Sequence, residues 1–372
     1  MSRPIQIGIG VAVACVIAVV PAGQATGQIA DPTTRADAWI REEMAARKIP
    51  GMSVAVVQDG KIVFERAYGL ANVELEVPAT TQTRFIIAST TKAWAATAIM
   101  MLVEQGKVGL NQPIGELVPD LPASWRTVPV RRLLSHTSGL PDVSVSANTP
   151  ELLAHTRDSA LMIAGAKPLD FAAGTRWAYN QTNYVLLGMV IDRVTGTPFM
   201  IWILEHIAKP LGLASPVFGD SRAVIPGRTT QYTRWALDAQ GPPRPLDSLR
   251  VTSYLYEPWM QMAAGLNMTA ADLARFGDAV RAGRLIKPAS RDTMWTAITL
   301  SDGKVFRFGG TSGMGLGWAV DDDPVGKVAG MDGGAAASLR VFPARKLTVA
   351  VLTNLQGAGP EQLSLGVAGF FK

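Results

Sequence analysis

The chain has 372 residues, of which 48% are hydrophobic and 17% are charged, and its formal net charge is +5. This length and composition are typical of a globular protein with a sizeable core, arranged as one large domain or two small ones. The positive charges are spread along the chain, and no run of Lys and Arg interleaved with aromatic residues indicates a nucleic-acid surface. We therefore expect no nucleic-acid partner.

The first 27 residues have the order of a secretory signal peptide. Arg3 supplies a positive charge, the segment Ile5–Val20 is almost wholly apolar, and small residues follow as far as about Ala25. The apolar run is shorter than the roughly 20 residues that a membrane span needs, so we expect no stable membrane insertion after cleavage. The pattern predicts an exported protein, periplasmic or secreted, whose mature part is residues 28–372.

The residues that bind metals or form disulfides are scarce. The only cysteine, Cys15, lies inside the leader, and the preceding Ala12–Ala14 makes a poor lipoprotein signal. The mature chain is therefore expected to have no disulfide, no thiol nucleophile and no cysteine metal site. Because His136, His155 and His206 are isolated from one another, a zinc site is not expected either. We predict no metal and no cofactor.

Local patterns predict strands near both ends of the chain. Met52–Val57 and Lys61–Tyr68 are rich in β-forming residues, and Asp59-Gly60 between them suits a type I′ hairpin turn. An amphipathic helix is expected before this hairpin, over Thr34–Lys48, with its core side formed by Ala38, Ile40, Met44 and Ala45. The expected C-terminal elements are strands at 315–320, 327–331, 336–342 and 346–352 and a closing helix at 361–371.

The middle of the chain, from Val108 to roughly Phe276, has the pattern of helices and long loops, with one helix at about 269–282. The glycine-rich segment 310–317 lacks the Lys-Ser/Thr of a phosphate loop, so it is interpreted as turns. These patterns predict an α/β fold of the α+β type. One sheet is built from about 34–88 and 277–372, and a helical insertion covers about 89–276.

The segment Ala88–Val103 carries the strongest chemical signal. Between Ala93 and Val103 only Thr97 is polar, so this helix, which Gly106 is expected to end, should be buried on every side. Ser89 and Lys92 stand three residues apart, which places the hydroxyl and the amine on one helix face. A lysine in an apolar setting loses its proton more easily and can then accept the serine proton. The pair predicts a nucleophile with its base.

A simpler interpretation makes Ser89 a helix cap and Lys92 a solvated residue of the first turn. The helix dipole makes the first turn a poor place for a cation, which favours the catalytic interpretation. His136, in the polar stretch Leu133–Leu140, is interpreted as a structural hydrogen-bonding residue rather than a catalyst.

Several motifs occur in a characteristic order. They are Ser89-Thr90-Thr91-Lys92, Leu-Leu-Ser-His-Thr-Ser-Gly-Leu ending at Leu140, Arg176-Trp177-Ala178-Tyr179, Ala263-Ala264-Gly265-Leu266 and Val351-Leu352-Thr353-Asn354. Together they resemble the serine β-lactamase and penicillin-binding-protein superfamily, in the branch of class C β-lactamases, family VIII esterases and D-stereospecific peptidases. The resemblance covers nearly all of the mature chain. It implies a β-lactamase/transpeptidase-like fold, with an antiparallel sheet flanked by helices and the active site at their interface. An α/β-hydrolase is not supported, because the sequence has no G-x-S-x-G motif.

The resemblance implies a role for each matching residue. Ser89 is the expected nucleophile and Lys92 its base partner. Tyr179 matches the tyrosine of a Y-x-N motif, which passes the proton towards the leaving group. The N–H groups of Ser89 and Gly334 are expected to form an oxyanion hole, since a helix N-terminus and a strand edge offer preorganised donors.

Two motifs depart from the family pattern. The asparagine of Y-x-N is replaced by Gln181, although Ser146-Ala147-Asn148 offers an alternative second motif. The third motif, usually Lys or His, then a small residue, then glycine, is Met331-Asp332-Gly333. The lost cation normally attracts a substrate carboxylate, so a carboxylate is expected to meet an unpaired site or the like charge of Asp332.

The altered third motif shapes the functional hypotheses. With Asp332 as a nearby anion, Lys92 is expected to hold its proton more firmly, so that activity rises towards alkaline pH. Arg176 and Arg340 are alternative cations for a carboxylate, although a solvated arginine is the simpler interpretation of each. The favoured hypothesis is a secreted serine hydrolase that forms an acyl-Ser89 intermediate from a small uncharged ester, lactone or amide. The alternatives are a catalytically weak binding protein and a β-lactamase or D,D-peptidase, and no oligomeric state follows from the sequence.

Overall fold

The computed structural model describes residues 31–143, 156–236, 244–308, 312–323 and 326–371. The predicted leader with Cys15, the alternative motif Ser146-Ala147-Asn148 and His155 lie outside these ranges. The chain divides into two units, Met1–Asp31 and Pro32–Lys372, and the fold and the site belong to the second.

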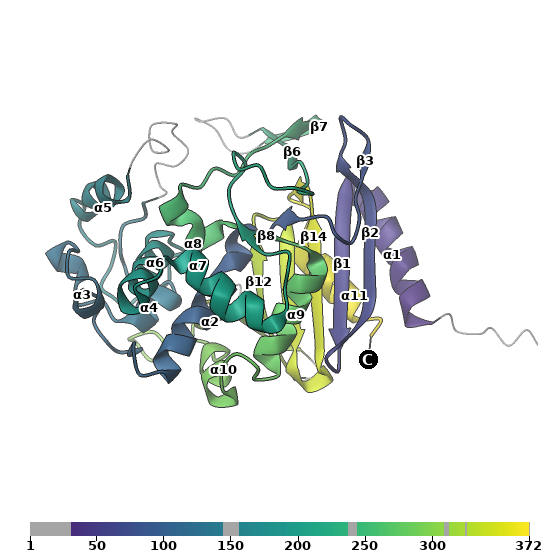
Figure 1. The fold of residues 1–372 in the computed structure, drawn as a ribbon. Helices are drawn as coiled ribbons and strands as arrows, with labels where there is room; N and C mark the ends of the chain where they lie inside the picture. Colours follow the sequence, from purple (N-terminus) through teal and green to yellow (C-terminus); the bar gives the residue numbers. More distant parts are fainter. Residues whose placement is uncertain (1–30, 144–155, 237–243, 309–311, 324–325, 372) are drawn as a thin grey trace, which may run out of the picture. The chain divides into compact units, whose positions relative to one another are not determined.

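A nine-stranded antiparallel sheet joins the two ends of this unit (Figure 1). Its strand order is β3-β2-β1-β14-β13-β12-β11-β10-β9, so the first strand of the chain pairs with the last strand of the sheet. The prediction of one sheet from both termini is confirmed. Its strands are β1 (Gly51–Gln58), β2 (Lys61–Asn72), β3 (Val77–Pro78), β9 (Arg307–Phe308), β10 (Ser312–Met314), β11 (Ala319–Asp323), β12 (Gly326–Gly333), β13 (Ala337–Phe342) and β14 (Leu347–Thr353).

The turn between β1 and β2 follows from two residues. Asp59 and Gly60 both have positive φ, 49° and 79°. A type I′ turn needs positive φ at both central residues, and Asp-Gly meets this need at low steric cost. The predicted hairpin is confirmed.

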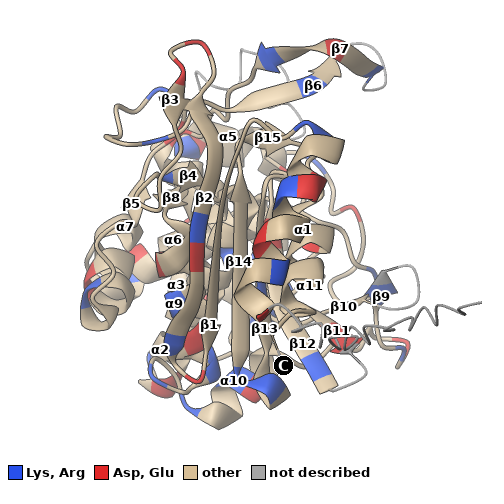
Figure 2. Cartoon of the chain, turned by 90° about the vertical axis from the view of Figure 1, so that its right-hand side faces the viewer, with Lys and Arg blue, Asp and Glu red and all other residues tan. Residues whose placement is uncertain are grey.

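Helices cover both faces of the sheet. On one face, α9 packs against β1, β13 and β14, and on the other α11 packs against β13 and β14 with α1 beside it (Figures 1 and 2). The helices are α1 (Pro32–Arg47), α2 (Thr91–Glu104), α3 (Ile114–Leu117), α4 (Val130–Leu134), α5 (Arg157–Gly165), α6 (Thr182–Thr195), α7 (Phe199–Ile203), α8 (Gln261–Ala264), α9 (Ala270–Arg281), α10 (Pro288–Met294) and α11 (Pro360–Ala368).

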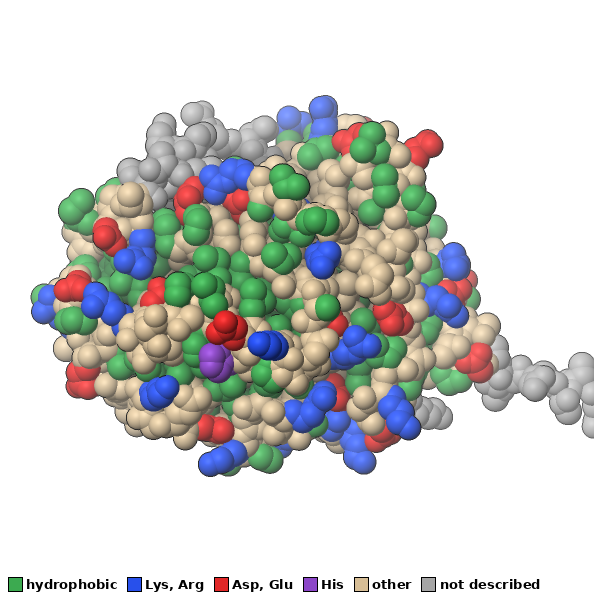
Figure 3. All heavy atoms as spheres, in the orientation of Figure 1, with side chains coloured by type: hydrophobic (Ala, Val, Ile, Leu, Met, Phe, Trp, Pro, Cys, Tyr) green, Lys and Arg blue, Asp and Glu red, His purple; other side chains and the backbone are tan. Residues whose placement is uncertain are grey.

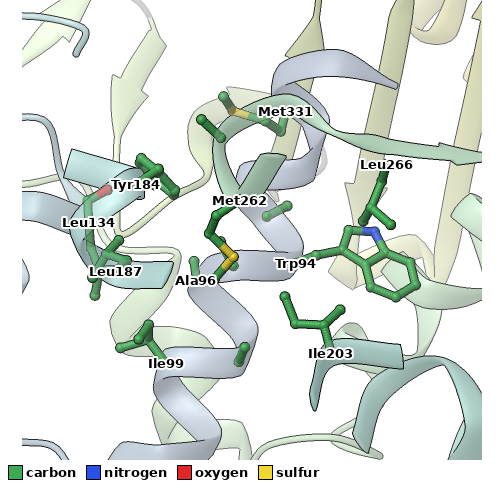
Figure 4. Packing of buried hydrophobic residues seen from close by; sticks show 14 of the residues in the cluster. Trp94, Ala96, Ile99, Leu134, Tyr184, Leu187, Ile203, Met262, Leu266 and Met331 are labelled. Atoms are coloured by element: carbon green, nitrogen blue, oxygen red, sulfur yellow. Dashed lines mark hydrogen bonds between the residues drawn. The ribbon is translucent and has the colours of Figure 1, made fainter. Parts of the chain in front are cut away.

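Helix α2 is buried in the core of the helical part, as its apolar sequence predicts. Trp94 is fully buried and stacks on Phe276 of α9 with ring centroids 4.1 Å apart. Figure 4 shows Trp94 and other α2 side chains among apolar residues from several elements. Gly106 has a φ of +70° just beyond the helix, and the next N–H, from Lys107, bonds to the Leu102 carbonyl at 3.0 Å. This is the expected glycine-dependent end of the helix.

Three sequence predictions about elements are wrong in part. On α1, Ile40 is buried but Ala38 and Ala45 are exposed, because Ala36 takes the inward position. The strand expected at 315–320 begins only at Ala319, since Gly317 has a φ of +74°. The segment between α2 and α9 also contains short strands, which form two small sheets with strands from outside it. These strands are β4 (Phe85–Ile86), β5 (Val217–Phe218), β6 (Tyr232–Ala236), β7 (Arg244–Val251), β8 (Leu266–Met268) and β15 (Leu355–Gln356).

Two features of the described residues concern the molecular surface: the distribution of charge on one face and the length of the apolar helices. On the face drawn in Figure 3, Lys and Arg side chains are interspersed with Asp and Glu. Over the described residues, no single helix has the length and apolar composition of a membrane span. The helix α6 and the segment Phe199–Leu211 pass that test only as a pair bent by 81°.

Candidate active site

The site begins where α2 begins. A 3₁₀ turn, Ala88–Thr90, leads directly into α2, and Ala88 has a φ of 41°, which is uncommon for a residue other than glycine. This turn leaves Ser89 partly exposed at the helix N-terminus, while Lys92 one turn later is fully buried. The local spacing thus brings the two side chains together, as predicted.

The Lys92 amine is surrounded by acceptors and aromatic rings. Its Nζ lies 2.8 Å from Gln181 Oε1, 2.8 Å from the Ala263 carbonyl and 3.4 Å from Ser89 Oγ. The Tyr179 ring centroid is 4.7 Å from the same nitrogen. Burial lowers the pKa of Lys92, and Tyr179 and Asp142 oppose this effect only in part. A neutral amine is therefore more accessible than in a solvated lysine.

The sequence-based expectation about Lys92 needs correction. We expected the anion Asp332 to make Lys92 hold its proton more firmly, but Asp332 is not among the groups that shift the pKa of Lys92, which burial lowers. The Asp332 carboxylate pairs with Arg340 at 2.6 Å.

Tyr179 also contacts the serine. Its hydroxyl donates to Ser89 Oγ at 2.7 Å. The His136 ring lies against the Tyr179 ring with centroids 4.6 Å apart, and His136 Nδ1 accepts a hydrogen bond from the Asn180 N–H at 3.1 Å. Burial, reinforced by the Lys92 charge, holds the pKa of His136 well below its ordinary value. The hydrogen-bonding role predicted for His136 is confirmed, because its ring accepts the Asn180 N–H and packs against Tyr179.

Gln181 reaches the site despite the longer side chain. It lies at the start of α6, where its backbone N–H donates to Asp142 Oδ2 at 3.2 Å. Its side-chain carbonyl accepts from Lys92. Gln181 therefore links the lysine to the same segment that carries Tyr179.

The end of β12 closes the other side of the site. A Cβ on Gly333 would lie 1.9 Å from the Ile87 carbonyl oxygen and 2.9 Å from the Ser89 nitrogen, so only glycine permits this approach. Gly334 was expected on the strand, but the strand ends at Gly333 and Gly334 opens the turn to β13, with a φ of +56°. The pairing of Gly333 with Ala337 fixes the turn at this point.

The side chains of Met331 and Asp332, the two other residues of the altered motif, lie in different surroundings. Met331 is 7% exposed and belongs to the core cluster around α2 (Figure 4). The Asp332 side chain is 35% exposed and pairs with Arg340, which is 2% exposed and also lies 3.4 Å from Glu361. Arg340 is thus neither solvated nor directed at a substrate carboxylate.

These elements enclose a cleft of about 460 Å³. The lining comes from Ser89, Tyr179, the end of β12 and the N-terminal residues of α11. Its lining residues are Ser89, Tyr179, Met331, Asp332, Gly333, Gly334, Ala335, Gly359, Pro360, Glu361 and Gln362. Across the described ranges, no group of three or more His, Cys, Asp or Glu side chains is placed to hold a metal ion.

Sequence reasoning missed four contributors to the site. The Ala263 carbonyl bonds to Lys92, and Asp142 holds the Gln181 backbone. The Tyr254 hydroxyl donates to the Gly334 carbonyl at 2.7 Å, and Glu361 shares Arg340 with Asp332. Ala263 stands in the Ala263-Ala264-Gly265-Leu266 motif, but the motif did not indicate its bond to Lys92. The other three stand at no readable spacing from the predicted residues, since each comes from a distant part of the chain.

With this geometry established, comparison with known proteins defines the family. A family model described as Beta-lactamase matches residues 36–368, which is most of the chain. The chain belongs to this beta-lactamase family, and the β-lactamase/transpeptidase-like fold is confirmed.

Individual relatives share only modest sequence identity with this chain. Penicillin-binding protein 4* of Bacillus subtilis (strain 168) is 27% identical over 330 residues, which are 85% of this chain and 71% of the relative. Protein flp of Staphylococcus aureus (strain MW2) is 30% identical over 193 residues, half of this chain but only 39% of that longer protein. A D-stereospecific amidohydrolase from Streptomyces sp. has 26% identity and a TM-score of 0.71, over 89% of this chain and 97% of that structure. These similarities support a hydrolase.

Proposed function

We propose that this protein is a serine hydrolase that cleaves an uncharged ester, lactone or amide through an acyl-Ser89 intermediate. One observation carries the proposal: the Ser89 hydroxyl touches both a fully buried lysine amine, at 3.4 Å, and a tyrosine hydroxyl, at 2.7 Å. A nucleophile between a desolvated base and a second proton carrier is the arrangement that acyl transfer requires.

The geometry suggests an order of steps. Ser89 Oγ attacks the substrate carbonyl carbon while its proton passes to neutral Lys92, and the carbonyl oxygen becomes an oxyanion. The N–H groups of Ser89 and Gly334 are the proposed donors to this oxyanion. Collapse expels the alcohol or amine, which takes its proton from Tyr179, and Lys92 returns a proton to Tyr179. Water then cleaves the acyl-serine ester to release the acid.

The lining of the cleft supports an uncharged acyl group over a carboxylate. Met331 replaces the family's cation with an apolar side chain, and no Lys or Arg is among the described residues that line the cleft. A carboxylate would be desolvated there without a partner. We therefore consider β-lactams and D,D-peptides less suitable substrates than a neutral ester or amide.

The place of action is a separate proposal, which rests on sequence alone. The segment 1–27 has the order of a signal peptide, so the hydrolase is proposed to act outside the cytoplasm. When the protein is recovered from a bacterial periplasm, N-terminal sequencing should show that the mature chain begins after about residue 25 to 27. An N-terminus at Met1 would contradict export by cleavage.

The direct test of the reaction is hydrolysis of p-nitrophenyl butyrate by the mature protein. Wild type is expected to release p-nitrophenol at a rate that Ser89→Ala reduces by at least about 1,000-fold, to the background reaction. Ser124→Ala is a matched control, because Ser124 is exposed and is not among the residues that line the cleft. Equal rates for wild type and Ser89→Ala would refute the proposal and favour a binding protein.

A further inference from the structure

The turn that joins β12 to β13 carries Gly334, whose N–H is a proposed donor to the oxyanion. The Ala336 N–H bonds to the Gly333 carbonyl at 3.0 Å and so closes a β-turn. Gly334 and Ala335 are the central residues of this turn, and their φ angles are 56° and 52°. Positive φ at both central positions is the pattern of a type I′ turn.

The sequence Gly-Ala at these positions favours a different turn. The left-handed region is less accessible to alanine than to glycine by a factor of about 5 to 30. A type II′ turn needs positive φ only at its first central residue, where this chain has glycine. Rotation of the Gly334–Ala335 peptide by roughly 180° would give type II′ and relieve Ala335. A contact outside the turn must therefore hold this peptide in its type I′ orientation.

The Tyr254 hydroxyl makes a contact of this kind. It donates at 2.7 Å to the Gly334 carbonyl, which belongs to the peptide that would rotate. The tyrosine is itself held in place, because its N–H bonds to Ser221 Oγ at 2.8 Å and its carbonyl accepts from the Ser221 N–H at 2.9 Å. Its ring also stacks on Tyr256. Burial raises the pKa of Tyr254 to about 12, so the hydroxyl remains a donor at neutral pH.

The N–H groups of the turn have no competing acceptor. Within the part of the chain that the structure describes, neither the Gly334 N–H nor the Ala335 N–H donates to another residue. The N–H and C=O of a trans peptide point in opposite directions, so the Ala335 N–H points away from Tyr254. Gly334 and Ala335 line the cleft, whereas Tyr254 does not. The Ala335 carbonyl, in the next peptide, is fixed separately by the Gly357 N–H at 3.0 Å.

We infer that Tyr254 is a positioning residue that holds this turn in the type I′ form, with the Gly334 carbonyl turned towards the tyrosine and the N–H groups left to the cleft. The inference rests on the proposed function, because the benefit of this orientation is an intact oxyanion hole. In the type II′ form, the negative end of the Gly334 carbonyl would turn towards the cleft and repel an oxyanion. Since Tyr254 does not line the cleft, it acts through the turn.

Tyr254→Phe tests the inference because it removes only the hydroxyl. For p-nitrophenyl butyrate, kcat and kcat/KM are expected to fall together by about tenfold or more, since the oxyanion develops only in the transition state. A crystal structure of the variant should show a negative φ at Ala335. Tyr68→Phe is the matched control: it removes a phenol hydrogen bond of 2.9 Å, to Asp37, and Tyr68 does not line the cleft. Its kcat should stay at the wild-type value.

The double variant Tyr254→Phe/Ala335→Gly separates an effect on the turn from a loss of packing around the tyrosine. Glycine adopts positive φ about as readily as negative φ, so the turn should keep its type I′ form without the hydroxyl. We expect kcat of the double variant to exceed that of Tyr254→Phe by about fivefold. A packing defect around Tyr254 would not be repaired by a change at Ala335.

The outcomes separate the inference from the proposed function. A type I′ turn in the structure of Tyr254→Phe, a kcat of that variant equal to that of Tyr68→Phe, or no recovery in the double variant would overturn the role of Tyr254 and leave the hydrolase in place. If wild type does not hydrolyse the ester through Ser89, the proposed function fails. The crystal structure of Tyr254→Phe then decides alone whether the hydroxyl holds the turn.

Discussion

Lys92 has no exposed surface, and this burial governs how it can act. A catalytic lysine must be neutral to accept the Ser89 proton, and its pKa lies below the ordinary 10.5 because desolvation disfavours the charged form. The active form of the enzyme therefore accumulates as pH rises through the lowered pKa. In the wild type, kcat/KM for a neutral ester should have a rising limb with its midpoint below 10.5.

Gln181→Glu should shift the midpoint of this rising limb to higher pH. The new carboxylate would take the place of an amide oxygen 2.8 Å from Lys92 Nζ. An anion so close favours the charged lysine, so the midpoint should rise by about 1 to 3 pH units and activity at neutral pH should fall. Gln105→Glu, at an exposed position beyond the other end of α2, is the matched control. A midpoint that stays in place in Gln181→Glu would show that Lys92 is not the titrating base.

Among individual residues, contacts between neighbours in the sequence were predictable, and contacts between residues far apart in the sequence were not. Ser89 and Lys92 are predictable because three residues of helix place them on one face. The pairing of Asp332 with Arg340 was not predictable, since it depends on the length of the turn between β12 and β13. That turn sets the register, and a shift of one residue would turn Arg340 to the other face of the sheet.

The junction between β12 and the start of α2 is the most constrained contact between elements in the site. Gly333 lets the strand approach the turn that carries Ser89, and any Cβ there would overlap the Ile87 carbonyl oxygen. The backbone oxygen is not a flexible side-chain end, so a larger residue must move one element away from the other. The position of Ser89 relative to the turn at Gly334 depends on this contact.

Gly333→Ala is expected to impair catalysis more than folding. A displacement of about 1 Å at a reacting group can cost about 100-fold in rate, so kcat/KM should fall by that order. Thermal unfolding measured alongside shows whether the sheet has survived. Gly109→Ala, in an exposed loop where no atom lies closer to the new Cβ than Gln112 Cβ at 3.2 Å, should leave both values near those of wild type. Wild-type activity in Gly333→Ala would mean that the contact does not position the site.

Elements with strong local signals were predictable, and elements held by tertiary contacts were not. The hairpin of β1 and β2 is encoded by β-rich runs around Asp59-Gly60. Strand β7 was missed because it has no buried face: its residues are exposed or half-buried along its whole length. Without alternation of buried and exposed residues, a strand has no period-two signal in its sequence. Its pairing with β6 is what holds it.

At the scale of the whole molecule, the site exists only when distant parts of the chain meet. Ser89 and Lys92 come from the first third of the sequence, Tyr179 and Gln181 from the middle, and the end of β12 with the start of α11 from the last part. The sheet makes this possible because β1 pairs with β14 and so joins the two ends of the unit. The family resemblance predicted this assembly. Composition and periodicity alone indicated only a sheet built from both ends of the chain and a helical region between them.

The proposed reaction depends on a covalent intermediate on Ser89, and trapping that intermediate is its most direct test. Wild-type protein is mixed with excess p-nitrophenyl ester, quenched in acid within the first turnovers, and analysed by intact-mass and peptide mass spectrometry. We expect a mass increase of one acyl group, located on the peptide that contains Ser89 and absent from Ser89→Ala. Hydrolysis without any adduct under burst conditions, or an adduct on another residue, would contradict it.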